Sequence, residues 1–263
     1  MSVPLAASEY GLADAKRPPL AILHGLFGSG RNWATLAQRL ATERLVILFD
    51  LRNHGASPWA DAMSYAEMAE DLRVAMAARG HRRYALLGHS MGGKVAMMLA
   101  LRDAGAVERL VVADIAPVPY RPRHLDYVRA MLALDLAAVS RRGEGDSRLA
   151  AAIPDPAERA FLVQNLVFEN GQPRWRLNLA AIEREMPELV GFPELHPESV
   201  YRGPALFVAG GCSDYLRTEH EPAIRRLFPA AEIVRIDGAG HWLHVEQPTA
   251  FLAAVEPFLA ANV

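Results

Sequence analysis

The chain has 263 residues, enough for one large domain or for one domain that carries an insert. Its formal charge of -2 gives no electrostatic reason to expect nucleic acid or an anionic membrane as a partner. Cys212 is the single cysteine, which excludes an intrachain disulfide, and the sequence shows neither a signal peptide nor an apolar stretch long enough for a bilayer, so we expect a cytoplasmic protein.

Short apolar runs predict the strands of a sheet. They lie at residues 19–23, 45–49, 84–87, 110–113, 205–209 and 233–236. Continuous apolar strands that alternate with helical patterns are typical of a parallel sheet covered on both faces. Polar residues and glycines follow these runs, at the edge where open α/β sheets bind their ligands. The sequence therefore predicts an α/β fold with a mostly parallel, doubly wound sheet.

Residues 119–201 interrupt this alternation. They show no convincing strand pattern, they contain helical patterns at 126–139 and 156–168, and prolines punctuate them. We interpret the segment as a helical cap inserted between two strands. The predicted organisation is thus a core from residues 1–118 and 202–263, with a cap from residues 119–201.

The motif Gly88-His89-Ser90-Met91-Gly92 has the G-x-S-x-G pattern. It follows a predicted strand and precedes a predicted helix, which is the context that a nucleophile elbow requires. Glycines two residues before and after the serine leave room for a tight turn. Ser90 is therefore the candidate nucleophile.

A serine hydroxyl is a weak nucleophile at its own pKa and needs a base. His241 follows the last predicted strand, in Gly238-Ala239-Gly240-His241-Trp242, and so reaches the same sheet edge as Ser90. The alternative role for His241 is a buried histidine that satisfies a loop carbonyl. His244 lies three residues further on and is the weaker candidate. We predict that His241 is the base.

The base needs an acid, and two aspartates compete for that role. Asp114 follows the strand after the elbow, and Asp214 follows the next sheet strand, beyond the cap. Both keep the order serine, acid, histidine along the chain. Either could instead form an ordinary turn or helix N-cap. The residues alone leave the choice open.

An oxyanion needs hydrogen-bond donors. The amide of Met91 lies at the start of the helix after the nucleophile, where free amides and the helix dipole favour negative charge. The second donor is expected from the loop after His24-Gly25, with Leu26 first and Phe27 as the alternative.

The polar segment Asp50–Pro58 also follows a predicted strand. We interpret it as a hydrogen-bonded structural turn. Its Asp, Arg and His side chains could suggest a metal or phosphate site, but neither G-x-x-x-x-G-K-[ST] nor H-E-x-x-H accompanies them. We predict no metal site.

Five strings together resemble the α/β-hydrolase superfamily and, within it, the YbfF-type bacterial esterases and their mitochondrial abhydrolase relatives. They are His24–Ser29, Asp50–Gly55, Gly88–Lys94, Asp114–Val118 and Gly238–Trp242. The resemblance implies an α/β-hydrolase fold and a cofactor-free carboxylesterase or thioesterase active on small acyl esters. It also implies Asp114 as the acid, although this chain departs from that subfamily by having Asp214 as well.

We therefore expect a serine hydrolase that works through an acyl-enzyme, binds a small ester or thioester, and needs no cofactor. A perhydrolase or haloperoxidase and a C–C bond hydrolase would use the same triad. A non-catalytic binding module of the same shape is the alternative from a different class. The oligomeric state is not predicted.

Apolar residues of the cap are the candidates for an acyl pocket above Ser90, unless they only pack the cap onto the core. The predicted pocket residues are Leu132, Leu136, Phe161, Leu162, Leu166 and Phe168, together with Trp242 of the histidine loop.

Overall fold

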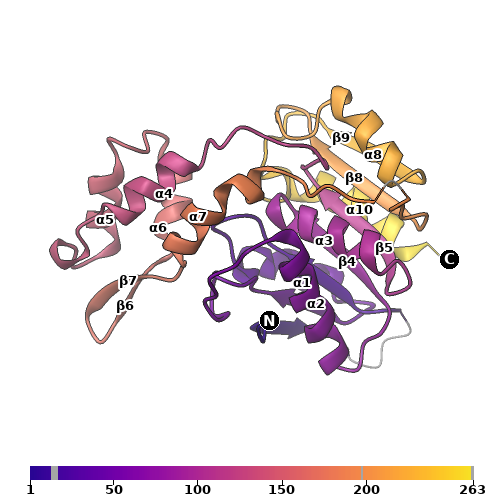
Figure 1. The fold of residues 1–263 in the computed structure, drawn as a ribbon, viewed down its shortest axis with the longest axis horizontal. Helices are drawn as coiled ribbons and strands as arrows, with labels where there is room; N and C mark the ends of the chain where they lie inside the picture. The colour runs from indigo at the N-terminus through magenta and orange to yellow at the C-terminus, as the bar shows by residue number, and fades with distance from the viewer. Residues whose placement is uncertain (13–16, 197, 262–263) are drawn as a thin grey trace.

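A computed structural model describes residues 1–12, 17–196 and 198–261 (Figure 1). Its centre is a seven-stranded sheet in the order β1-β3-β2-β4-β5-β8-β9. The strands are β1 (Ala7–Tyr10), β2 (Leu20–Leu23), β3 (Val46–Phe49), β4 (Tyr84–His89), β5 (Val107–Ala113), β8 (Ala205–Gly210) and β9 (Ala231–Ile236). All neighbouring pairs are parallel except β1 with β3.

The six predicted strands are present, and the predicted fold class is confirmed. The sequence reading missed β1, an edge strand whose residues are half-buried or exposed. Such a strand lacks the continuous apolar run by which the buried strands were recognised. Its antiparallel pairing with β3 therefore had no signal in the pattern.

Helices cover both faces of the sheet because each strand directs alternate side chains to opposite sides. The helices of this part are α1 (Ala34–Leu40), α2 (Tyr65–Ala78), α3 (Met91–Arg102), α8 (Glu221–Leu227), α9 (Leu243–Glu246) and α10 (Pro248–Ala260). Ala21 and Leu23 of β2 belong to the hydrophobic core that also contains residues of α2 and α3, whereas Leu20 and Ile22 belong to the core that contains residues of α1 and α10.

The insert lies between β5 and β8 and forms a separate lobe beside the sheet (Figure 1). It contains α4 (Leu125–Leu132), α5 (Arg142–Leu149), α6 (Pro156–Val163), β6 (Leu166–Glu169), β7 (Gln172–Trp175) and α7 (Leu179–Val190). The predicted boundaries at 119 and 201 fall inside the connections on either side, and as boundaries they remain predictions.

Two expectations for the insert were wrong. The segment 156–168 is not one helix, because α6 ends at Val163 and an antiparallel hairpin of β6 and β7 follows. Asn170 and Gly171 form its turn with φ values of 51° and 79°, the left-handed conformations that an Asn-Gly hairpin turn requires. The segment 126–139 is also divided, because α4 ends at Leu132 and Asp135 caps a separate short 3-10 helix at residues 136–138.

Within the described ranges, none of the helices has the length and apolar character needed to cross a membrane.

Candidate active site

Ser90 lies in the sharp turn between β4 and α3, with φ 52° and ψ -120°. A side chain in this region of backbone space is strained and is held there only by its surroundings. The turn also packs closely, since a Cβ at Gly92 would lie 2.5 Å from the carbonyl oxygen of His24. The glycine that follows the serine by two residues is therefore required by the space available.

His241 connects Ser90 to an acid. Its Nε2 lies 3.0 Å from the hydroxyl oxygen of Ser90, and its Nδ1 lies 2.7 Å from Oδ2 of Asp114. A carboxylate accepts hydrogen bonds, so Nδ1 carries the proton and Nε2 is left to accept the serine proton. The structure thus brings three of the predicted residues into one hydrogen-bonded chain.

Asp114 is fully buried and has two further hydrogen-bond donors. The amide of Gly210 donates to Oδ1 at 2.9 Å, and the hydroxyl of Ser213 donates to Oδ2. These bonds hold the carboxylate in place beneath His241. Ser213 and Gly210 were not singled out from the sequence, although Gly210 ends β8 and Ser213 lies three residues beyond it.

Asp214 is not brought to the histidine. Its side chain is 60% exposed. Its Oδ2 lies 3.6 Å from Nη2 of Arg123, and its Oδ1 lies 3.9 Å from Nε of Arg217. The loop after β8 directs Ser213 toward Asp114 and leaves its neighbour at the surface. Two adjacent side chains of this loop therefore point in different directions, and the geometry favours Asp114 over Asp214 as the acid.

The three amides predicted as oxyanion donors differ in whether they already donate a hydrogen bond within the protein. The amide of Phe27 donates to Nε2 of His54 at 3.2 Å. Among the described residues, the amides of Leu26 and Met91 have no such acceptor. Leu26 lies beside Ser90 in the walls of two cavities, and Met91 is the first residue of α3. This geometry favours Leu26 over Phe27 as the second donor.

His244 lies too deep to serve Ser90. Its ring stacks on Trp33 with 4.1 Å between centroids, and burial lowers its pKa to about 3. His89, within the elbow motif itself, donates from Nε2 to the carbonyl oxygen of His241 at 2.8 Å. His89 therefore fixes the backbone of the candidate base, a role that the sequence reading missed.

Two chambers meet at Ser90. The first lies beside His241 and is open to the solvent. The second lies beside α7, with Met91, Met186 and Leu189 in its walls. Ser90, Leu26 and His124 line both chambers, so the candidate nucleophile faces two adjoining spaces.

Only some of the predicted pocket residues line these chambers. Phe161, Leu162 and Trp242 line the first. Leu132, by contrast, is 44% exposed, and Leu166 is buried inside the cap. Leu136 and Phe168 also lie outside both chambers and pack against the hydrophobic core. The chambers instead use residues that the apolar pattern did not reveal, namely His124, Tyr127, Glu158, Met186 and Leu189.

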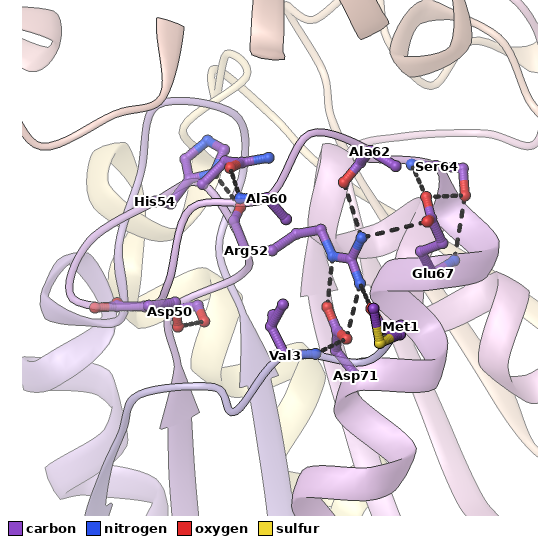
Figure 2. A network of polar contacts seen from close by, with 12 residues as sticks. Met1, Val3, Asp50, Arg52, His54, Ala60, Ala62, Ser64, Glu67 and Asp71 are labelled. Carbon is purple, nitrogen blue, oxygen red and sulfur yellow. Dashed lines mark hydrogen bonds and ion pairs between the residues drawn. The ribbon is translucent and has the colours of Figure 1, made fainter.

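The polar side chains of the loop after β3 hydrogen-bond to other parts of the protein and so stabilise the fold (Figure 2). Arg52 is buried and donates from Nε and Nη2 to the carboxylate of Asp71 at 2.6 and 2.9 Å, and from Nη1 to the carbonyl oxygen of Ala62 at 2.8 Å. Nδ1 of His54 donates to the carbonyl oxygen of Arg52 at 3.0 Å. Asp50 accepts from the amides of Gly30 and Ala56. Within the described part of the chain, no group of three or more His, Cys, Asp or Glu side chains is arranged to hold a metal.

Comparison with known proteins gives one consistent result. A family model described as alpha/beta hydrolase fold matches residues 18–248. The sn-1-specific diacylglycerol lipase ABHD11 of Xenopus laevis is 41% identical over 261 residues, which is 95% of this chain and 83% of that protein. Esterase YbfF of Escherichia coli is 34% identical over 92% of each chain. A solved structure titled "Marine microorganism esterase" is 37% identical with a TM-score of 0.93, over 98% of this chain and all of that one.

Proposed function

The chain belongs to the α/β-hydrolase fold family and is a hydrolase of the esterase and lipase type, and from this premise we propose that it is a serine esterase that works through an acyl-enzyme. The observation that carries the proposal is the hydrogen-bonded chain from Ser90 through His241 to Asp114 at the junction of two chambers. A serine, a base and an orienting acid in this geometry are the parts that acyl transfer requires.

In the first half-reaction, the Ser90 oxygen attacks the ester carbonyl while Nε2 of His241 takes the hydroxyl proton. Asp114 holds the ring with Nδ1 protonated and stabilises the imidazolium that forms. The negative charge that develops on the carbonyl oxygen is placed toward the amides of Leu26 and Met91. His241 then gives its proton to the leaving alcohol, and the acyl group remains on Ser90.

In the second half-reaction, a water molecule occupies the place of the alcohol. His241 takes its proton, the oxygen attacks the acyl carbonyl, and the proton returns to Ser90 as the carboxylic acid leaves. Both steps use groups of this chain alone, and neither requires a cofactor.

The two chambers have different relations to this chemistry. The leaving oxygen must receive its proton from His241, so the alcohol part belongs in the first chamber, which contains that histidine. The acyl chain then extends into the second chamber beside α7, among Met91, Met186 and Leu189. Small esters fit this division, since each side of the scissile bond has its own space.

The proposal is tested by rapid mixing with p-nitrophenyl acetate. An acyl-enzyme route predicts an initial burst of p-nitrophenol, up to one per enzyme molecule, when deacylation is the slower step. A series of p-nitrophenyl esters and matched thioesters from two to ten carbons then measures the acyl preference. Absence of ester and thioester turnover throughout the series would refute the proposed function.

A further inference from the structure

The chamber beside His241 contains a carboxylate that the proposed reaction does not use. Glu158 lies in the first turn of α6 and is one of the residues that line this chamber. The hydroxyl of Tyr127, from α4, donates a hydrogen bond to its Oε2. This bond raises the pKa of Tyr127 to about 12, so the phenol keeps its proton and stays a donor.

The part of the chain that the structure describes places neither lysine nor arginine in the walls of this chamber. Arg159, the neighbour of Glu158, is engaged elsewhere and donates to Asp146 at 3.0 Å. Burial lowers the pKa of His124 to about 4 and of His244 to about 3, and it lowers the pKa values of His24 and His89 as well. These four rings are therefore neutral at pH 7.

The remaining surface of the chamber is largely aromatic. Phe161 and Trp242 lie with ring centroids 5.2 Å apart, and Phe27, Trp33 and Tyr127 also line the space. The negative faces of aromatic rings attract an ammonium group, and a carboxylate nearby adds to that attraction. An anionic group would meet repulsion here instead.

We propose that Glu158 and the surrounding aromatic rings select esters whose alcohol part carries an ammonium group. The proposal rests on the proposed function, because it assigns the leaving alcohol to the chamber that contains His241. In the reaction, the acyl C–O bond breaks, His241 protonates the leaving oxygen, and water supplies the oxygen that ends in the carboxylic acid. Glu158 binds the cation and takes no proton.

The test uses two acetate esters that have the same shape and differ in charge. Acetylcholine carries a quaternary ammonium group, and 3,3-dimethylbutyl acetate carries a carbon in its place. We expect the wild-type enzyme to have a higher kcat/KM for acetylcholine. Glu158→Gln should lower the ratio of the two kcat/KM values about tenfold, with the larger change on the cationic ester.

Glu183→Gln is the matched control. Glu183 belongs to the same cap, pairs with Arg129 at 3.1 Å and lies outside both chambers. This variant should leave the ratio as in the wild type. Tyr127→Phe removes the hydrogen bond and keeps the carboxylate, so it should retain the preference for the cation. Circular dichroism confirms that each variant folds.

A second measurement does not depend on turnover of either ester. Choline and 3,3-dimethylbutanol, the two alcohol parts, are compared as inhibitors of p-nitrophenyl acetate hydrolysis. Tighter inhibition by choline that is lost in Glu158→Gln supports the proposal. Equal inhibition by both alcohols, or a preference that Glu158→Gln leaves intact, overturns it while the esterase function stands. Absence of p-nitrophenyl acetate turnover would refute the proposed function itself.

Discussion

Two groups of polar side chains lie at the same edge of the sheet and have different roles. In the loop after β3, Arg52 hydrogen-bonds to Asp71, and His54 hydrogen-bonds to backbone groups of the protein. At the elbow, Ser90 and His241 bind each other and also face an open chamber. The difference indicates how a catalytic group of polar residues can be told from a structural one. The catalytic pair faces an open chamber, whereas a conspicuous sequence motif alone does not separate the two.

The largest expected effect is at the elbow. Ser90→Ala should lower kcat/KM on p-nitrophenyl acetate by a factor of about 10⁴ or more, because the nucleophile is lost while the surrounding fold stays. Circular dichroism and thermal unfolding provide the control for folding. Wild-type activity in this variant would mean that the elbow, like the loop after β3, is only structural.

The next effect separates the two aspartates. Asp114→Asn should lower kcat by roughly 10³ to 10⁴, because the amide no longer holds His241 with Nδ1 protonated. Asp214→Asn is the matched variant and should have little effect, since that side chain is exposed and pairs with Arg123 and Arg217 at the surface. Steady-state kinetics of both variants decides the question, and a greater loss for Asp214→Asn would contradict the geometry.

In the loop after β3, the expected effect is on stability. Asp71→Ala removes the carboxylate that accepts two hydrogen bonds from the buried guanidinium of Arg52 and leaves Arg52 paired with Glu67 at 3.5 Å, so it should lower the free energy of unfolding by about 3 kcal/mol. Glu70→Ala, on the exposed side of the same helix, is the control and should change it by less than about 1 kcal/mol. Urea unfolding measures both. If the Asp71→Ala variant kept its stability but lost turnover, the loop after β3 would have a role in the reaction, which would contradict this prediction.

The sequence predicted some of these features better than others. The elbow, His241 and six strands carry local patterns, and the structure has them at the predicted places. Edge strand β1 and the hairpin of β6 and β7 are short and partly exposed, so their apolar pattern is weak. The Asn170-Gly171 turn was the signal that the hairpin did carry.

Other features depend on contacts between segments far apart in the chain. The strand pattern did not distinguish Asp114 from Asp214, because both follow sheet strands, and the preference for Asp114 came from the family resemblance alone. The hydrogen bonds of Asp114 with Gly210 and Ser213 cross 96 and 99 residues. The lining of the chambers has the same origin, since helical patterns do not show which side of a cap helix faces Ser90.

A smaller effect concerns pH. Burial lowers the pKa of His54 to about 3, whereas an exposed histidine titrates near 6.5. Between pH 3 and about 6.5, His54 therefore binds a proton in the unfolded chain but not in the folded chain. The free energy of unfolding consequently falls as pH decreases from about 6.5 toward 3. At pH 5 this one group accounts for about 2 kcal/mol. His54→Asn should flatten the slope of unfolding free energy against pH between 5 and 7, and an unchanged slope would contradict this assignment.

The proposed reaction requires Ser90, rather than another polar side chain of this sheet edge, to be the nucleophile. The most direct test is reaction with a fluorophosphonate probe, followed by mass spectrometry of the intact chain and of its peptides. We predict one adduct per chain, located on Ser90 and absent from Ser90→Ala. No adduct on the folded wild-type protein, or an adduct on another residue such as Ser213, would contradict the account.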